Sequence, residues 1–236
     1  MNFLDRILYE PSGGQFREFA GVTTHLAPAD LSLYRDILPQ PLSIPSCPTV
    51  TIFIADYMKV FSWPMTPYRE WSVLLRCRYE EHEAWYPITM PVTAWIPMKG
   101  GRRIGFPKYV MENIALSKEG DTITGTAVHN GILQLELRFS AGHSRQLSDW
   151  EKELADNEAF FKGGCLCLVP PGVGPHVVKL DLIHVVPPKW TPQHGMVTVH
   201  ANPGESWTAL LAEDGPFPGT YNHFIGGINL HVERLA

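Results

Sequence analysis

TITGTAVHNGILQLELRFS, residues 122–140, consists of two short runs joined by His-Asn-Gly, and apolar side chains alternate with polar ones along both runs. Alternation with a period of two is typical of a strand that is buried on one face only. An Asn-Gly pair between two such runs is a strong signal for a tight β-turn. This stretch therefore predicts an antiparallel hairpin.

Similar runs lie on both sides of this hairpin. They are rich in Val, Ile, Thr and aromatic residues and occupy residues 49–57, 70–80, 165–170, 176–186 and 195–201. Glu-Glu-His-Glu at 80–83 predicts a turn between two further strands. Consecutive hairpins favour antiparallel pairing, so we expect a mainly β fold in which the sheet curls into a barrel or a sandwich.

Helical patterns are few. Residues 31–39 form one candidate, capped by Asp30 and ended by Pro39. Residues 147–164 form a second, in which Ser148 and Glu151 have the spacing of a capping box. We expect both helices to be short elements beside the sheet.

Composition indicates a soluble globular protein. Of the 236 residues, 44% are hydrophobic and 18% are charged, and we expect one domain over residues 1–236. The net charge of -5 without a run of like charges argues against nucleic acid or a membrane surface as a partner. Apolar runs are too short to span a bilayer, and the N-terminus lacks the pattern of a signal peptide, so we expect a cytoplasmic protein.

The usual motifs for metals and cofactors are missing from the sequence. The ten histidines and four cysteines show no zinc-binding spacing, so we expect no metal site and interpret the cysteines as buried free thiols. There is no Gly-x-Ser-x-Gly, and GGRRIG at 100–105 lacks the glycine spacing of a dinucleotide loop. We therefore expect no cofactor.

Lysine chemistry is the remaining candidate, because GGRRIGFPKYV at 100–110 places Lys108 among apolar residues. An amine attacks a carbonyl group only when unprotonated, and the ordinary lysine pKa near 10.4 leaves well under ~1% free amine at neutral pH. Burial, or a positive charge such as Arg102 or Arg103, disfavours the ammonium form. On local pattern alone, a lysine with its stem on nearby rings and its head in water is the simpler interpretation.

A resemblance to a known protein family favours a reactive, buried Lys108 over a lysine with its head in water. GRRIGFPKY resembles the signature of the acetoacetate decarboxylase family, in which an aromatic residue and a proline precede the lysine that forms a Schiff base; Lys108 falls on that lysine. TPYREWSV at 66–73 is similar to the family's Tyr-x-Glu strand, and Glu70 falls on its active-site glutamate. Residues 33–44 and 177–190 resemble further family segments more weakly.

The resemblance implies a β-rich fold with the lysine in its interior. The family's core is a cone-like or closed antiparallel β-barrel with flanking sheets and a few short helices, and its members commonly form homo-oligomers. The sequence departs from the family at three positions. Tyr109 replaces a second lysine, Ala20 lies near a substrate-facing arginine, and Phe53 lies near a second glutamate.

From the resemblance we expect a lyase that forms a Schiff base with a small or medium keto acid, most simply to decarboxylate a β-keto acid. Lys108 would be the nucleophile, and Glu70 would organise the pocket or handle protons. Candidate substrate-binding residues are Arg102, Tyr68, Phe106, Tyr109 and Tyr221. Two alternatives remain open: an aldolase-dehydratase that uses the same lysine enamine, and a ligand-binding barrel without activity. We interpret the aromatic and glycine residues of 215–230 as packing and turns in preference to a lid over the substrate.

Overall fold

Eleven strands dominate the computed structural model, which describes residues 16–60, 66–142, 164–169, 176–212 and 215–235. The mainly β class expected from the sequence is confirmed. The strands are β1 (Phe16–Leu26), β2 (Val50–Val60), β3 (Tyr68–Tyr79), β4 (His82–Val92), β5 (Lys108–Val110), β6 (Asn113–Glu119), β7 (Thr122–His129), β8 (Ile132–Ala141), β9 (Cys165–Val169), β10 (His176–Ala201) and β11 (Phe217–Arg234). The described helices are α2 (Leu31–Ile37), α3 (Trp95–Arg103) and the 3-10 helix η1 (Ser206–Leu210).

Both predicted hairpins are present. β7 and β8 pair antiparallel around Asn130 and Gly131, whose φ angles of 51° and 76° are those that a tight hairpin turn needs at both central positions. β3 and β4 pair antiparallel around Glu80, which also has a positive φ.

The first predicted helix is confirmed as α2, in which the backbone amide groups of the second and third residues, Ser32 and Leu33, donate to the Asp30 carboxylate at 2.8 and 3.0 Å. The second predicted helix falls on residues 147–164, nearly all of which lie outside the described residues.

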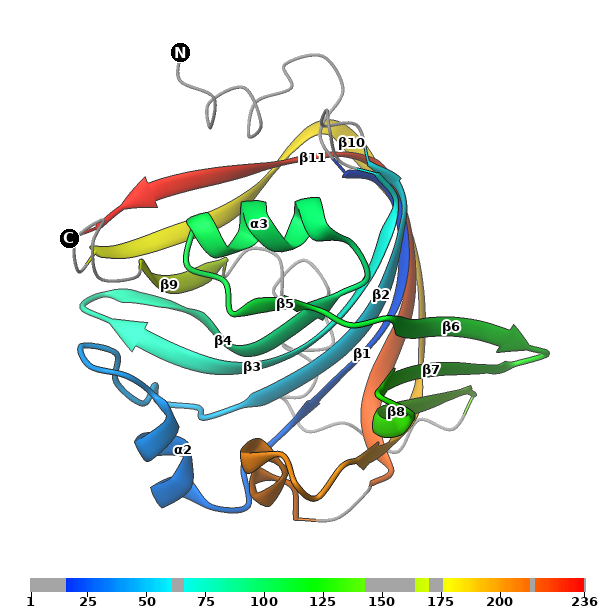
Figure 1. The fold of residues 1–236 in the computed structure, drawn as a ribbon, viewed down its shortest axis with the longest axis horizontal. Coiled ribbons are helices and arrows are strands. Elements are labelled where there is room, and N and C mark those ends of the chain that lie inside the picture. The colour runs from blue at the N-terminus through cyan, green and yellow to red at the C-terminus, as the bar shows by residue number, and fades with distance from the viewer. Residues whose placement is uncertain (1–15, 61–65, 143–163, 170–175, 213–214, 236) are drawn as a thin grey trace.

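Seven strands form a ring of pairings. The order runs β11-β1-β2-β3-β4-β9-β10, and β10 also pairs with β11, so that the path returns to its first strand. The β4–β9 pairing is parallel, and the other six are antiparallel. From β10 the sheet continues through β8 and β7 to β6, which project beside the ring (Figure 1).

β10 joins the two parts of the sheet because it is a single strand of 26 residues. The sequence predicted two separate strands here, 176–186 and 195–201. The residues between them remain extended and pair with β11, with register shifts between His184 and Lys189. Pro187 and Pro188 have no amide hydrogen to donate to a ladder, which explains why the sequence suggested a break.

The interpretation of residues 215–230 as packing is confirmed for the aromatic residues, since Phe217, Tyr221 and Phe224 pack in hydrophobic clusters, but the interpretation as turns is wrong, because Phe217–Arg234 form β11. Gly219 of this strand lies where neighbouring strands approach closely. A Cβ atom on Gly219 would lie 2.5 Å from Cγ2 of Val197 and 2.7 Å from the carbonyl oxygen of Thr23. Glycine therefore permits pairing on both sides of β11, although it weakens the strand pattern in the sequence.

The main hydrophobic core lies between the ring and the strands that flank it. It joins one face of β1, β2 and β3, including Val22, Ile52 and Val73, to β7, β8 and the end of β10, including Leu137 and Val197. The opposite face of β1–β3 points into the ring. Alternation along each strand thus separates a packed core from the interior of the ring.

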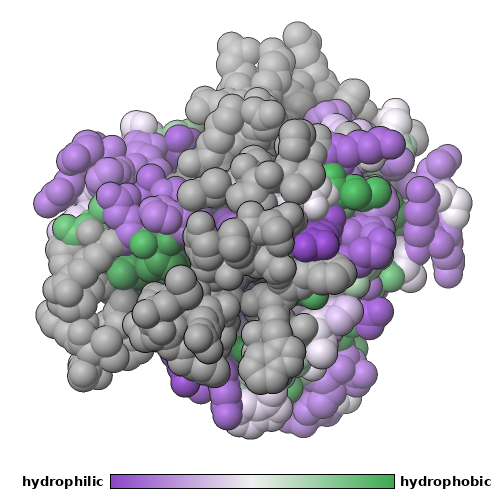
Figure 2. Space-filling view, turned by 90° about the horizontal axis from the view of Figure 1, so that it is seen from above, coloured by the Kyte–Doolittle hydropathy of each residue, from purple (hydrophilic) through white to green (hydrophobic). Residues whose placement is uncertain are grey.

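Figure 2 shows one face, on which hydrophilic residues predominate and hydrophobic residues form small separate groups. No helix in the described ranges is long and apolar enough to cross a membrane.

Candidate active site

Lys108 is brought into the ring by α3 and β5. α3 lies across the opening between β10–β11 and β3–β4 (Figure 1), and the chain then turns at Gly105, where φ is +92°. β5 pairs in parallel with β4, so that Lys108 lies beside Met90. No helix was predicted from the sequence at this position, because Pro97, Gly100 and Gly101 obscure the pattern of α3.

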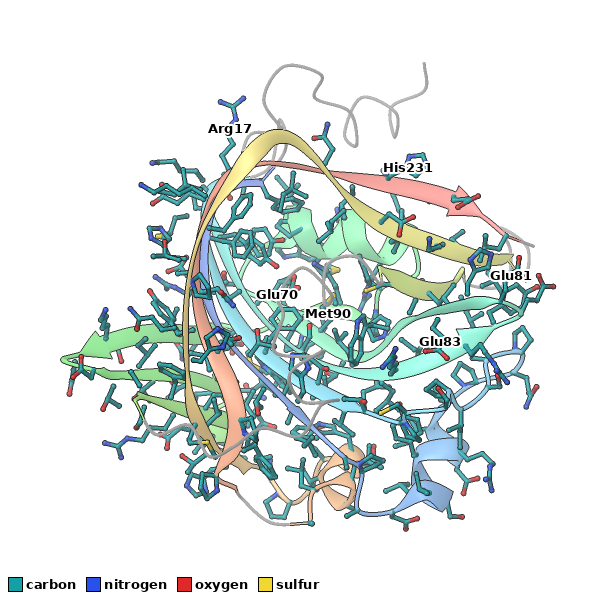
Figure 3. All side chains as sticks on the ribbon, turned by 180° about the vertical axis from the view of Figure 1, so that it is seen from behind. Arg17, Glu70, Glu81, Glu83, Met90 and His231 are labelled. Atoms are coloured by element: carbon teal, nitrogen blue, oxygen red, sulfur yellow. The ribbon has the colours of Figure 1, made fainter. Side chains whose placement is uncertain are left out.

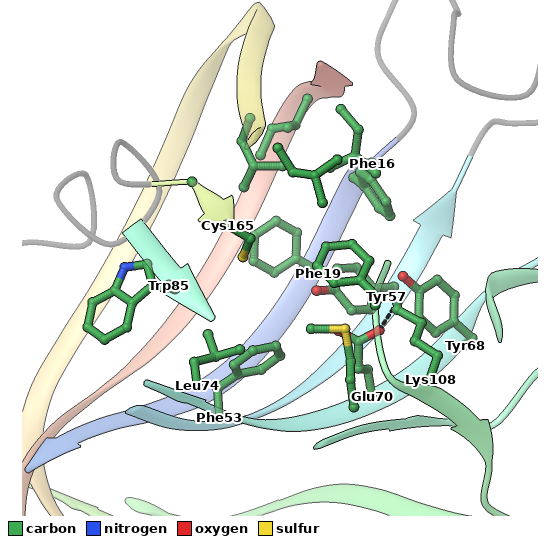
Figure 4. A pocket seen from close by; sticks show the side chains of 17 residues that line it. Phe16, Phe19, Phe53, Tyr57, Tyr68, Glu70, Leu74, Trp85, Lys108 and Cys165 are labelled. Carbon is green, nitrogen blue, oxygen red and sulfur yellow. Dashed lines mark hydrogen bonds and ion pairs between the residues drawn. The ribbon is translucent and has the colours of Figure 1, made fainter. Parts of the chain in front are cut away.

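Inside the ring, the ammonium group of Lys108 forms a hydrogen-bonded ion pair with Oε2 of Glu70 on β3 (Figure 4). Lys108 is 6% exposed and Glu70 is 3% exposed. Burial raises the pKa of Glu70, and the attraction of Lys108 acts in the opposite direction. The pair therefore holds a proton between two groups that are removed from water.

The stem of Lys108 rests on the backbone of α3 at Gly101. A Cβ atom on Gly101 would lie 2.5 Å from Cδ and 2.8 Å from Cε of Lys108. Arg102 holds the same segment from outside, because its Nε donates to the carbonyl oxygen of Lys108 at 2.5 Å. Backbone contacts thus fix the direction of the lysine.

Two aromatic rings lie close to the amine. Nζ of Lys108 is 5.6 Å from the ring centre of Tyr68 and 5.4 Å from that of Phe106. Ring faces at such distances attract a cation. Tyr57 stacks on Tyr68 with centroids 4.7 Å apart, and burial raises the pKa of both phenols, which stay neutral.

The pair forms part of the wall of a cavity of about 120 Å3 (Figure 4). All seven strands of the ring contribute to the lining. Its members are Phe16, Phe19, Phe53, Tyr57, Tyr68, Glu70, Leu74, Trp85, Met90, Phe106, Lys108, Gly164, Cys165, Leu180, Leu182, Ile228 and Leu230. Glu70 and Met90 point into the ring in Figure 3, whereas Arg17 and His231 project outward.

Four of the seven predicted site residues meet in this cavity: Lys108, Glu70, Tyr68 and Phe106. The other three do not line it. Arg102 is exposed on α3, and Tyr109, which follows Lys108 in β5, packs against the main core. Tyr221 lines a separate hollow of about 260 Å3 together with Lys118, whose Nζ is 5.8 Å from its ring centre.

The positions that depart from the family pattern lie on both sides of the sheet. Phe53 lines the cavity, but Ala20 lines the second hollow, on the other face. Asp56, the acid nearest to Phe53 in sequence, lines that hollow as well. Asp56 accepts a hydrogen bond of 2.9 Å from Nε of Arg69 there. Glu70 and Lys108 are consequently the only charged residues among those that line the cavity in the described part of the chain.

Several lining residues were not singled out from the sequence. Tyr57 had a detectable signal, because it lies four residues after Phe53 on β2 and alternation turns both to the same face. Phe16 and Phe19 did not, since a bulge between Phe16 and Glu18 interrupts the alternation of β1. Cys165 is a free thiol, as expected, and burial raises its pKa to about 12.

No group of three or more His, Cys, Asp or Glu side chains within the described ranges is arranged to hold a metal ion.

Comparison with protein families agrees with this geometry. The profile of the acetoacetate decarboxylase (ADC) family matches residues 21–163, more than half of the chain. The chain belongs to the acetoacetate decarboxylase family. Both Glu70 and Lys108 lie within the matched residues. A comparison with curated proteins finds no match.

Several solved structures share the fold. An acetoacetate decarboxylase has a TM-score of 0.70 at 13% identity, with 96% of this chain and 91% of that chain covered. The acetoacetate decarboxylase of Legionella pneumophila has a TM-score of 0.68 at 20% identity, covering 97% and 90%. The enduracididine biosynthesis enzyme MppR, in complex with the condensation product of pyruvate and imidazole 4-carboxaldehyde, has a TM-score of 0.69 at 14% identity, covering 97% and 91%.

Proposed function

We propose that this protein is a carbon–carbon lyase that decarboxylates a small or medium β-keto acid through an imine on Lys108. One observation carries the proposal: the buried Lys108–Glu70 pair on the wall of a mostly apolar cavity. An amine in such a place is kept from water and is held where a carbonyl compound of a few carbons can reach it.

The reaction begins with a proton transfer. Lys108 must lose a proton before its nitrogen can attack a carbonyl carbon, and Oε2 of Glu70 is the group to which it is hydrogen-bonded. Because burial raises the pKa of Glu70, the protonated carboxyl group is easier to form than in water. Glu70 thus acts as the general base for the attack and returns the proton in later steps.

The amine adds to the keto carbon, and loss of water leaves a protonated imine. The bond between the α-carbon and the carboxylate then breaks. Its electron pair moves through the α-carbon to the imine nitrogen, carbon dioxide leaves, and a neutral enamine remains. Protonation of the α-carbon and hydrolysis by water release the ketone and the free amine. The faces of Tyr68 and Phe106 stabilise the cationic imine.

Borohydride trapping tests the proposal. Incubation with acetoacetate and reduction should leave a stable adduct on Lys108, identified by mass spectrometry of the digested protein. Lys108→Met should abolish both adduct and carbon dioxide release, whereas Lys99→Met, at an exposed lysine of α3, should retain both. If no keto acid gives an adduct on Lys108, the proposal is wrong and the chain is a ligand-binding protein without this activity.

An aldolase-dehydratase reaction is the second candidate, because the enamine can add to an aldehyde instead of taking up a proton. Tyr57 and Tyr68 favour it, since neutral phenols in the cavity can donate a proton to the aldehyde oxygen. The complex of MppR with a condensation product of pyruvate and an aldehyde is consistent with such chemistry on this fold. A product that forms only when pyruvate and an aldehyde are both present would favour this candidate over decarboxylation.

A further inference from the structure

We propose that the second hollow, on the outer face of the ring, binds a small molecule that carries an ammonium group at one end of an aliphatic chain and a carboxylate at the other. This site is separate from the reaction proposed for Lys108. The polar residues in its lining include Glu18, Asp56, Lys118 and Tyr221. Three properties of the hollow point to such a ligand: its position, its charges and its size.

The second hollow and the cavity of Lys108 lie on opposite faces of the same strands. Phe19 of β1 and Tyr57 of β2 are paired in register and line the cavity, whereas the next pair, Ala20 and Asp56, lines the hollow. Neighbouring residues of a strand point to opposite faces of the sheet. A ligand in the hollow therefore does not reach Lys108, and it is not a substrate of the proposed reaction.

Ala20 lies in the middle of the wall that the ring provides. It is opposite Asp56 of β2 on one side and opposite His223 of β11 on the other. Because alanine has only a methyl group, it leaves space between these two larger neighbours. The facing wall comes from β6 and β7, which project beside the ring (Figure 1) and contribute Leu116 and Ile123 to the lining.

Two recessed carboxylates provide a place for the ammonium group. Glu18 forms an ion pair with Lys59, and Asp56 accepts a hydrogen bond from Arg69. The side chains of Lys59 and Arg69 are 62% and 46% exposed, whereas those of Glu18 and Asp56 are 16% and 22% exposed. The hydrogen bond from Lys59 lowers the pKa of Glu18, which therefore stays ionised at neutral pH. Exposed ion pairs are weak and a carboxylate has about four acceptor sites, so both acids can still bind an ammonium group.

Lys118 of β6 provides a place for the carboxylate. Its Nζ lies 5.8 Å from the ring centre of Tyr221 on β11. Since β1 separates β11 from β2, the backbones at Tyr221 and Asp56 are about 10 Å apart or more, two spacings between neighbouring strands. The cation thus meets the hollow two strands away from Asp56. A ligand with its two charges at opposite ends of a chain fits this separation better than an α-amino acid does.

The hollow is large enough for such a chain. Its volume of about 260 Å3 exceeds the roughly 150 Å3 of an apolar cavity that holds benzene. Met58, Leu116 and Ile123 also line it, and their apolar side chains can contact methylene groups. A chain of several carbons with one charge at each end therefore suits both the size and the mixed lining of the hollow.

Four probes of equal carbon number test the proposal. 6-Aminohexanoate carries both charges at opposite ends, its isomer 2-aminohexanoate carries both at one end, and hexanoate and hexylamine carry one charge each. NMR titration at pH 7.5 should give 6-aminohexanoate a Kd at least about tenfold lower than that of the other three, the smallest factor expected for one hydrogen bond to a charged group. Equal affinities for 6-aminohexanoate and hexylamine, or no binding of 6-aminohexanoate, would overturn the proposal.

Two variants locate the bound probe. Lys118→Gln should weaken the binding of 6-aminohexanoate and hexanoate about tenfold and leave hexylamine unchanged, whereas Asp56→Asn should weaken 6-aminohexanoate and hexylamine and leave hexanoate unchanged. Lys99→Gln and Asp121→Asn are the controls, because these residues are exposed and do not line the hollow. An unchanged Kd for 6-aminohexanoate in both Lys118→Gln and Asp56→Asn would place the probe elsewhere and overturn the proposal.

Binding in the second hollow does not depend on the imine chemistry. Lys108→Met should keep the wild-type Kd for 6-aminohexanoate, because Lys108 lies on the other side of the strands. If Lys108→Met loses this affinity, the probe binds inside the ring and the proposal is wrong. A failure of keto acids to form an adduct on Lys108 would overturn the proposed function and leave this second site standing.

Discussion

Glu70 and Lys108 lie next to each other although 38 residues separate them in sequence, and each explains the burial of the other. An isolated charge at this depth would cost several kcal/mol, whereas a hydrogen-bonded pair recovers much of that cost. Both residues were predicted from short motifs, because an acid within a strand and a lysine behind Phe-Pro are visible locally. Their contact depends on the pairing of β3 with β4 and of β4 with β5, which no local pattern contains.

Substitution of Glu70 tests whether the reaction needs a carboxylate beside Lys108. Glu70→Gln keeps the size of the side chain but cannot accept the proton from Lys108, so kcat should fall by roughly 100-fold to 10000-fold, the range of general base catalysis. Single-turnover trapping with borohydride should slow to the same degree. Glu70→Asp restores the acid at a shorter reach and should recover part of the rate. Equal rates for Glu70→Gln and the wild type would show that Glu70 takes no part in proton transfer.

His25 on β1 should make the fold sensitive to acid. It is 6% exposed, its Nδ1 and Oγ1 of Thr51 are 2.7 Å apart, and burial lowers its pKa from 6.5 to about 4. Below pH 6.5 the unfolded chain binds a proton that the folded chain does not, so stability falls as the pH drops from 6.5 towards 4. The loss amounts to about 2 kcal/mol at pH 5 and about 3 kcal/mol at pH 4.

Urea unfolding of the wild type and of His25→Gln at pH 7.5 and pH 5 measures this effect. The wild type should lose about 2 kcal/mol more than the variant between the two values. Glu70 changes stability in the opposite direction, because its raised pKa makes the folded chain bind the extra proton; the comparison removes this contribution since both proteins keep Glu70. An identical pH dependence in both proteins would exclude His25 as the cause.

Among the elements, sequence patterns identified those whose partners are close in the chain. The β7–β8 hairpin and α2 have turn and cap residues beside them, and these act locally. α3 and β11 were missed because Gly and Pro within them serve contacts with distant strands, as Gly219 does beside Thr23 and Val197. Propensity is a weak guide wherever tertiary contacts select the residue.

Gly101 of α3 makes room for the side chain of Lys108, and this contact positions the amine in the site. The Cβ atom of Gly101→Ala would lie 2.5 Å from Cδ of Lys108, so the lysine stem must move, although alanine favours the helix itself by up to about 1 kcal/mol. We expect kcat to fall about tenfold to 100-fold without a loss of Tm, since small misplacement of a reacting group is costly.

The neighbouring Gly100→Ala is the control, because nothing lies within 4 Å of its added atom. A loss of activity in Gly100→Ala as well, or none in Gly101→Ala, would contradict a positioning role.

At the scale of the molecule, the cavity exists because the pairings return to their first strand. Its lining extends from Phe16 to Leu230 along the chain, and the β10–β11 pairing connects the last strand to the rest of the ring. The sequence resemblance indicated an interior lysine and a barrel-like core. It did not indicate that one 26-residue strand would belong both to the ring and to the flanking strands.

Gly219 lies at the junction, since it is opposite Thr24 of β1 and Gly195 of β10. In Gly219→Ala the new atom would lie 2.7 Å from a backbone oxygen, which cannot rotate away, so we expect the free energy of unfolding to fall by about 1–3 kcal/mol. Hydrogen exchange should accelerate in β1, β10 and β11 together and less in β6 and β7, because the three strands share this contact. Gly204→Ala, with its nearest atom at 3.4 Å, should leave both measurements unchanged. Faster exchange in β11 alone would mean that the ring does not depend on this junction.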